Sequence, residues 1–434
     1  MPIKDFEFQR SQQIKAAVIF PDIYGVHLSL SPQARLDEAC GLARAINLDI
    51  VHHDIIKVKM PKAGTLIGQG VIDDLSRIIA NQDIELVIFD TSLSPIQQRN
   101  LEEKLNVKVI DRTALILEIF GERAQTKEGK LQVELAHLTY QRSRLVRSWT
   151  HLERQRGGGG FLGGPGEKQI ELDRRLIDNK IIALKKDLEK VKLTRSIQRQ
   201  SRSRVPYPIV ALVGYTNAGK STLYNLLSSS SVLAQDMLFA TLDTSMSKIK
   251  LPSGSEIILS DTVGFISDLP HELIMAFRAT LEEVLQADLL IHVRDAAFEN
   301  SSQQKQDVLK VLSDIGLDNI TDSEKYLEVL NKIDLLSAER KNNLLNRLAP
   351  NQTALSALSG EGKELLLRKI DTVLQRHHQI ISLTIPAADG KNLAWIHRTA
   401  EVLSQQNIGE SLKLTIRASA ENIAKLRYRL SINQ

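Results

Sequence analysis

The stretch that decides the fold is Gly214-Tyr215-Thr216-Asn217-Ala218-Gly219-Lys220-Ser221. It fits the phosphate-loop pattern G-x-x-x-x-G-K-[ST], and it lies between an apolar run at 209–213 and a helix-like run that begins at Thr222. The glycines let backbone N–H groups turn toward phosphates, Lys220 can reach the β and γ oxygens, and the Ser221 hydroxyl can ligate Mg²⁺. The pattern therefore predicts a site for a nucleoside triphosphate, with an ordinary glycine-containing turn as the alternative.

Two further segments would complete the metal and γ-phosphate side of this site. Asp261-Thr262-Val263-Gly264 follows a strand-like run at 256–260, so we expect Asp261 to hold Mg²⁺ through water and the Gly264 N–H to face the γ-phosphate. Phe239-Ala240-Thr241 lies between the two motifs, and Thr241 is the candidate switch threonine, a plain loop threonine being the alternative. The predicted metal ligands are Ser221, Thr241 and Asp261, and the predicted catalytic groups are Lys220, Thr241 and Gly264.

The segment Asn331-Lys332-Ile333-Asp334 indicates which base is bound. It follows a strand-like run at 326–330, and the Asp334 carboxylate can accept from both N1–H and the exocyclic amine of guanine. Adenine offers the wrong pattern and would leave a buried charge without a partner. In Ser356-Ala357-Leu358, a backbone N–H can donate to the guanine carbonyl. These motifs predict GTP as substrate and GDP as product.

The residues around the D-x-x-G motif predict slow hydrolysis in isolation. Phe265 occupies the position where many GTPases carry a glutamine that orients the attacking water, and the sequence has no arginine between Arg204 and Arg278 to act as an arginine finger. Asn217 resembles the asparagine with which potassium-activated GTPases hold K⁺. A side chain that only stabilises the loop is the alternative for Asn217.

The composition is that of a globular protein. A length of 434 residues suggests about three domains, and 42% hydrophobic with 25% charged residues is ordinary for such a protein. Cys40 is the only cysteine, which excludes an internal disulfide and a Cys-rich metal site. The N-terminal residues lack an apolar signal region, and no apolar run is long enough to span a bilayer. We expect a cytoplasmic monomer.

Positive charge is concentrated in residues 121–204, which hold 20 Lys and Arg against 10 Asp and Glu. Because the whole chain carries +4, the remainder is mildly acidic. Such a segment favours contact with a polyanion, and a solvated helical face is the alternative.

The periodicity of apolar residues predicts an α/β protein with four parts. Residues 1–120 alternate strands (16–20, 49–58, 86–90, 107–111) with helices (32–46, 71–80, 95–105), which indicates a parallel α/β domain. Residues 121–204 predict an antiparallel coiled-coil hairpin with arms of about 35 Å, a length that follows from 1.5 Å per residue. Residues 205–375 form the predicted P-loop GTPase domain, and 376–434 a small α+β domain in the order β-α-β-α, with strands at 381–385 and 412–416.

The hairpin seam follows a 4-3-4-3 spacing in both arms: Leu131, Leu135, Leu138, Arg142, Leu145, Trp149 and Leu152, then Ile170, Ile177, Ile181, Leu184, Leu188 and Val191. The predicted tip, residues 157–166, has seven glycines in ten positions. It could follow an irregular RNA surface, with ring stacking on a base, or it could be a flexible linker. The candidate RNA-binding residues are Arg154, Arg156, Gly158, Gly159, Phe161, Leu162 and Lys168.

Several long fragments resemble the HflX family of bacterial GTPases: Thr65-Leu66-Ile67-Gly68-Gln69-Gly70, Leu93-Ser94-Pro95-Ile96-Gln97-Gln98-Arg99-Asn100, Gly129-Lys130-Leu131-Gln132-Val133-Glu134-Leu135-Ala136 and Gly163-Gly164-Pro165-Gly166-Glu167. The resemblance implies binding to the large ribosomal subunit and its RNA, ribosome-stimulated GTP hydrolysis, and rescue of stalled ribosomes by splitting under stress. The alternative is a nucleotide-sensing scaffold that binds RNA or protein, similar to a tRNA-modification GTPase.

Overall fold

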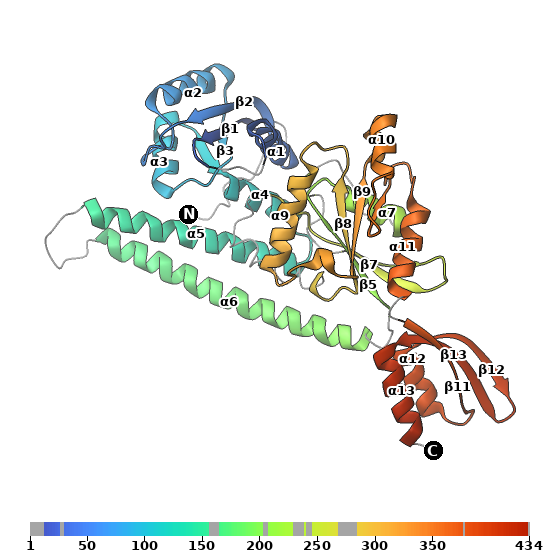
Figure 1. The fold of residues 1–434 in the computed structure, drawn as a ribbon. Helices are drawn as coiled ribbons and strands as arrows, with labels where there is room; N and C mark the ends of the chain where they lie inside the picture. Colours follow the sequence, from blue (N-terminus) through green and yellow to red (C-terminus); the bar gives the residue numbers. More distant parts are fainter. Residues whose placement is uncertain are drawn as a thin grey trace. The chain divides into compact units, whose positions relative to one another are not determined.

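The computed structural model describes residues 13–26, 30–155, 165–202, 207–228, 238–239, 245–267, 284–375 and 378–432 (Figure 1). The chain divides into two compact units. The first comprises Met1–Leu188, Gln235–Asp243 and Ile266–Arg278, and the second comprises Glu189–Ala234, Thr244–Phe265 and Ala279–Gln434. Two short pieces from within the GTPase sequence, around residues 238–239 and 266–267, therefore pack with the N-terminal residues.

The N-terminal part of the first unit is a four-stranded parallel sheet in the order β2-β1-β3-β4. The strands are β1 (Lys15–Ile23), β2 (Asp49–Val58), β3 (Leu86–Phe89) and β4 (Lys108–Asp111). The helices are α1 (Pro32–Ala45), α2 (Gln69–Gln82), α3 (Pro95–Leu105) and α4 (Arg112–Arg123). The predicted parallel α/β domain is confirmed, and the predicted strands and helices coincide with observed ones.

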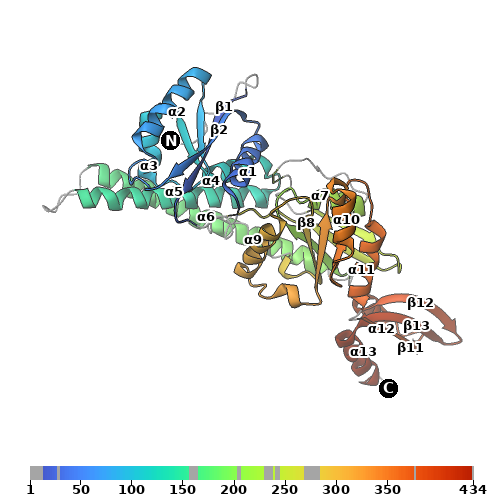
Figure 2. The same ribbon diagram turned by 45° about the horizontal axis from the view of Figure 1, so that its top comes forward.

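Alternating side chains of this sheet point to opposite layers of helices. Ala17, Val87 and Val109 belong to a core shared with α2 and α3, and α1 lies on the opposite face of the strands in Figure 2. Each of α1, α3 and α4 starts at a side chain that accepts a backbone N–H bond, Ser31, Ser94 and Asp111 respectively. These caps fix where the chain turns from strand to helix.

The hairpin consists of α5 (Lys127–Gln155) and α6 (Pro165–Arg202), which lie side by side (Figure 1). Ile181, Leu184 and Leu188 are buried, as the predicted seam requires. Arg142, a seam position of α5, pairs with Asp178 of α6 at 2.9 Å. The 38 residues of α6 span about 57 Å, so this arm is longer than predicted. One reason is that α6 starts at Pro165, inside the predicted tip, since proline suits the first turn of a helix.

The second unit contains a six-stranded sheet in the order β10-β9-β8-β5-β7-β6, of which only β6 runs antiparallel to its neighbour. Its strands are β5 (Ile209–Gly214), β6 (Ser245–Lys250), β7 (Glu256–Asp261), β8 (Leu289–Asp295), β9 (Tyr326–Asn331) and β10 (Gln352–Ala354). Around it lie α7 (Lys220–Ser228), α9 (Ser301–Asp314), α10 (Ala338–Leu345) and α11 (Lys363–Gln375). The predicted motif loops follow the carboxyl ends of β5, β7 and β9.

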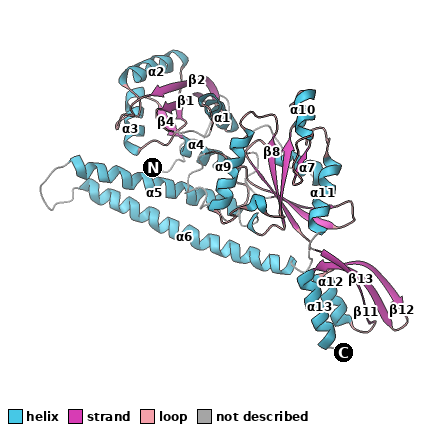
Figure 3. Ribbon diagram, viewed as in Figure 1, coloured by secondary structure: helices cyan, strands magenta, loops and turns pink. Residues whose placement is uncertain are grey.

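The C-terminal residues form an antiparallel sheet in the order β11-β13-β12, with two helices on one of its faces (Figure 3). The elements are β11 (His378–Pro386), α12 (Gly390–Thr399), β12 (Glu401–Ile408), β13 (Ser411–Ser419) and α13 (Ala420–Ile432). The predicted order β-α-β-α was wrong by one strand, β12. Its residues Ser404 to Asn407 are polar and exposed, so it lacks the apolar alternation that marks a strand.

No helix in the described part of the chain combines the length and apolar character that a membrane-spanning segment needs.

Candidate functional site

The phosphate loop connects β5 to α7, and two of its glycines are required by their surroundings. Gly214 has φ 152°, and a Cβ there would lie 2.2 Å from the Val293 carbonyl oxygen of β8. Gly219 has φ 88°, and its Cβ would lie 2.2 Å from the Asn331 side-chain nitrogen. No side chain fits in either place, so the loop can pack closely against two neighbouring strands.

Lys220 lies inside this loop. Its Nζ donates to the carbonyl oxygens of Gly214 at 3.0 Å and Tyr215 at 2.8 Å. Burial lowers the pKa of Lys220 to about 8, while the nearby Asp261 carboxylate acts in the opposite direction. A buried ammonium group whose two hydrogen-bond acceptors are backbone carbonyls is well suited to an anionic ligand such as a phosphate chain. Next to it, the buried hydroxyl of Thr216 has no hydrogen-bond partner among the described residues.

Ser221 and Asp261 meet as the predicted metal ligands should. The Ser221 hydroxyl donates to Asp261 Oδ2 at 2.8 Å, and Asp261 is completely buried at the end of β7. Hydroxyl and carboxylate oxygens are the donors that Mg²⁺ prefers. In the described residues no three His, Cys, Asp or Glu side chains gather as metal ligands. The donor set fits the ion.

The segment after Asp261 pairs with the phosphate loop through its backbone. Phe265 N–H donates to the Gly214 carbonyl at 3.1 Å, and Thr216 N–H donates to the Phe265 carbonyl at 2.7 Å. A Cβ on Gly264 would lie 2.8 Å from Thr216 Cγ2 and 3.1 Å from Lys220 Nζ. Gly264 is thus close to the lysine that is expected to bind the γ-phosphate. The ring of Phe265 is buried, and the neighbouring Thr262 and Val263 are buried too.

Asn331 connects the phosphate loop to the segment 356–358, which is predicted to bind the base. Its Nδ2 donates to the Ala218 carbonyl at 2.9 Å, and its Oδ1 accepts from the Ala357 N–H at 2.9 Å. The side chain is 1% exposed. If the Ala357 N–H is to bind a guanine carbonyl, it must share or exchange the Asn331 oxygen. One amide therefore aligns both ends of the predicted nucleotide site.

The other residues predicted to bind the base lie after β9 and β10. Asp334 is exposed and lies within a short 3-10 helix, Ile333–Leu335. Lys332, just before this helix, has φ 63°, and its Nζ forms an ion pair with Asp295 Oδ2 at 2.8 Å. Ser356 is fully buried, and Leu358 is 82% exposed.

Asn217 has φ 59° and is exposed at the fourth position of the phosphate loop. Asparagine tolerates this left-handed conformation better than most residues, which supports the loop-stabilising alternative.

Several predicted site residues lie outside the described part of the chain: Ala240, Thr241, Arg156, Gly158, Gly159, Phe161 and Leu162. Arg154 and Lys168 lie in α5 and α6, and the orientation of their side chains is not described. Phe239 is described and buried. Its ring packs edge-to-face on Phe120 of α4, with centroids 4.7 Å apart, so any contact with a nucleotide must come from its backbone.

Sequence reasoning missed a group of buried charged residues that contact the segment after the D-x-x-G motif. Ser267 is bonded to Arg35, Glu38 and Arg112 of the N-terminal sheet domain. These residues are more than 150 positions away in sequence and belong to no phosphate-binding motif. The sequence holds no local signal for such a contact.

Comparison with known proteins covers most of the chain. Three family descriptions match in succession: GTP-binding GTPase N-terminal at residues 33–121, GTP-binding GTPase Middle Region at 123–202, and 50S ribosome-binding GTPase at 209–332. The GTPase HflX of Magnetococcus marinus is 49% identical over 372 residues, which cover 86% of this chain and 85% of the relative. The GTPase HflX of Escherichia coli is 45% identical and covers 77% of each chain. The crystal structure of the SsGBP and GDP complex is 26% identical, covers 84% of this chain and 99% of that one, and has a TM-score of 0.47.

Proposed function

Because this chain belongs to the HflX family of GTPases, we propose that its GTP-bound form binds the large ribosomal subunit and splits or rescues stalled ribosomes under stress. The observation that carries the proposal is the presence, in one chain, of the Asn331-centred nucleotide site and a basic helical hairpin. The 50S ribosome-binding GTPase description of residues 209–332 supports the choice of subunit.

We assign the nucleotide contacts to the predicted residues. Lys220 binds the β and γ oxygens once it exchanges its carbonyl partners for phosphate, and the Gly264 N–H donates to the γ-phosphate. Ser221, Asp261 and Thr241 would hold Mg²⁺, which neutralises charge on the phosphates when it is bound. Asp334 recognises guanine. The buried Phe265 ring cannot orient the attacking water. In this proposal groups of the ribosome orient that water, and GTP turnover without ribosomes is slow.

Asn217 is the proposed K⁺ ligand. An exposed asparagine at the fourth loop position can offer its amide oxygen to a monovalent cation beside the phosphates. Hydrolysis should then be faster in potassium than in sodium chloride at equal ionic strength, and Asn217→Ala should remove the difference. Equal rates in both salts for the unaltered protein would rule out the ion.

We further propose that the protein is a cytoplasmic monomer with four domains, residues 1–120, 121–204, 205–375 and 376–434. The three matched family segments end and begin near 120/121 and 204/205, which supports the first two of these boundaries. Light scattering should give the mass of a single 48.5 kDa chain.

The decisive measurement is the affinity of the full-length protein for isolated large subunits, with a non-hydrolysable GTP analogue and with GDP. The proposal requires tighter binding with the GTP analogue. Ribosome-stimulated hydrolysis and the separation of stalled ribosomes into subunits would then be followed on the same preparation. Nucleotide-dependent binding without subunit separation would favour the second candidate, a nucleotide-sensing scaffold. Binding that ignores the nucleotide contradicts the ribosomal proposal.

A further inference from the structure

The residue Ser267 lies in a buried polar cluster of the first compact unit. Its hydroxyl accepts from Arg35 at 3.1 Å and donates to Glu38 at 3.2 Å, and its carbonyl accepts from Arg112 at 3.0 Å. Both arginines also pair with Asp90, and all these side chains are buried. Since buried charges must be paired, the cluster has few alternative arrangements. A displacement of Ser267 must therefore be followed by the charged side chains bonded to it.

Ser267 is three residues beyond Gly264, the glycine assigned to the γ-phosphate. Phe265, between them, is bonded through both its N–H and its carbonyl to the phosphate loop. Only Ile266 separates this paired residue from Ser267. A change at Gly264 on nucleotide exchange therefore reaches Ser267 through a short, constrained piece of backbone.

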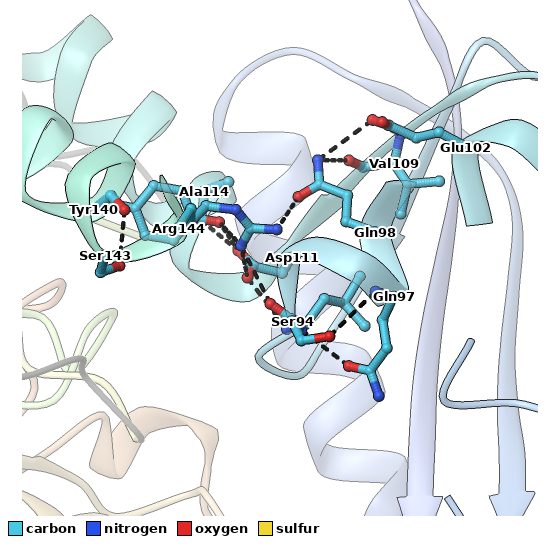
Figure 4. Close-up of polar contacts among 11 residues, drawn as sticks. Ser94, Gln97, Gln98, Glu102, Val109, Asp111, Ala114, Tyr140, Ser143 and Arg144 are labelled. Atoms are coloured by element: carbon cyan, nitrogen blue, oxygen red, sulfur yellow. Dashed lines mark hydrogen bonds and ion pairs between the residues drawn. The ribbon is translucent and has the colours of Figure 1, made fainter. Parts of the chain in front are cut away.

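Asp111, the residue before Arg112, is bonded to the first helix of the hairpin. Figure 4 shows its carboxylate facing α5: Tyr140 donates to Oδ1 at 2.9 Å and Arg144 to Oδ2 at 3.2 Å. Arg144 also donates to the Leu93 carbonyl and to Gln98. Burial raises the pKa of Tyr140, which keeps its hydroxyl protonated as a donor. Asp111 additionally caps α4 through the Ala114 N–H at 2.9 Å.

We infer that Asp111 and Arg112 form a junction that couples the segment after the D-x-x-G motif to the first helix of the hairpin. Arg112 is a positioning residue, because it binds the Ser267 carbonyl and moves when Ser267 moves. Asp111 is the adjacent residue and caps the same helix, so a shift of Arg112 also shifts Asp111. Asp111 in turn moves Tyr140 and Arg144, which are bonded to it. The inference deepens the proposed function, on which it rests, by naming the route from nucleotide to hairpin.

The surroundings of α5 leave it room to respond. An open groove of about 950 Å³ lies among α4, α5 and α6, and its lining includes Leu117, His137, Ile177 and Arg144 itself. The side of α5 that borders this groove has fewer packing partners than a helix face in a filled core, so a shift toward the groove breaks fewer contacts.

Hydrogen–deuterium exchange on the full-length protein tests the junction, because it measures local opening of a helix. Peptides from residues 130–145 of α5 are compared with GDP and with a non-hydrolysable GTP analogue. The variants are Arg112→Lys, which keeps the charge but loses the planar fork, and Ser267→Ala, which keeps every charge. Arg123→Lys is the matched control, because Arg123 is on the same helix and donates to the Ala45 carbonyl.

The unaltered protein should show exchange in α5 that differs between the two nucleotides. Arg112→Lys and Ser267→Ala should reduce this difference by about threefold or more, within the range for residues of a coupling network. Arg123→Lys should leave it unchanged. All three variants should keep their nucleotide affinity, whereas Arg112→Lys and Ser267→Ala should lower the melting temperature because each removes buried hydrogen bonds, so exchange is measured well below that temperature.

An undiminished difference in both variants overturns the junction, and so does a nucleotide-independent α5 in the unaltered protein. If α5 responds as described but large subunits bind equally with GDP, the ribosomal proposal fails and the junction is supported. The two ideas can therefore fail separately.

Discussion

Asp334 is the residue on which base selectivity depends, since its carboxylate is the predicted acceptor for two guanine donors. Asp334→Asn should weaken GTP binding about 10- to 100-fold, because a donor left without its acceptor costs about 1–3 kcal/mol. ATP binding is expected to be weak already and should change little. The ratio of GTP affinity to ATP affinity should therefore decrease. Competition between labelled GTP and unlabelled ATP measures both effects. Asp314→Asn, an exposed carboxylate at the end of α9, is the control. An unchanged preference would disprove the role of Asp334.

Lys220 gives the site a pH dependence with a defined sign. Its pKa of about 8 is below that of lysine in an unfolded chain, about 10.4. Between these values the unfolded chain binds one more proton, so this group makes the unliganded protein more stable as pH rises above 8. GTP binding has the opposite trend, because a neutral lysine cannot pair with phosphate. Affinity for GTP should fall by up to about tenfold per pH unit above 8.

Guanosine is the control ligand for this titration, because it has the base but no phosphate. Its affinity should stay level from about pH 7 to 8.5, below the pH at which guanine loses its N1 proton, while that of GTP declines. Parallel curves for the two ligands would show that some other group titrates.

At the scale of elements, the hairpin tip separates ribosome contact from nucleotide binding. Deleting residues 157–164 should leave GTP affinity unchanged, because none of the residues assigned to the nucleotide belongs to this segment. The deletion should abolish stimulation of turnover by ribosomes. Steady-state phosphate release with and without large subunits measures this. Replacing the same residues by eight glycines and serines keeps the length and removes Phe161 and Leu162. Full stimulation in that replacement would mean that the tip is only a linker.

Elements whose sequence carries its own signal could be predicted. The strands of the N-terminal sheet have apolar runs between turns, and the phosphate loop shows its glycines, which the structure explains by the nearness of Val293 and Asn331. The strand β12 could not be predicted, because its polar residues lie at an exposed edge. The partners of Ser267 and Phe239 could not be predicted either, because they are distant in sequence and only tertiary packing brings them into contact.

At the scale of the whole molecule, ribosome binding should depend on salt through the hairpin cations. Replacing Arg154, Arg156 and Lys168 by alanine should make the plot of log affinity against log salt shallower by about 2–3, since each phosphate contact contributes about 0.7–0.9. Sedimentation with large subunits at several salt concentrations gives the slope. Alanine at the exposed Lys57, Lys59 and Lys62 removes the same charge from the N-terminal domain and serves as control. Equal slopes for the two triple variants would place the RNA contacts elsewhere.

The assignment of residues 235–243 and 266–278 to the first compact unit limits how this protein can be dissected. A fragment beginning at residue 205 retains the phosphate loop, yet it loses Phe120 and Arg112, against which Phe239 and Ser267 pack. A turnover number measured on such a fragment would describe an enzyme in which the segments around Phe239 and Ser267 lack their packing partners. The smallest piece whose kinetics represent the native molecule consequently includes the N-terminal sheet domain, and surveys of truncated relatives should be interpreted with that requirement in view.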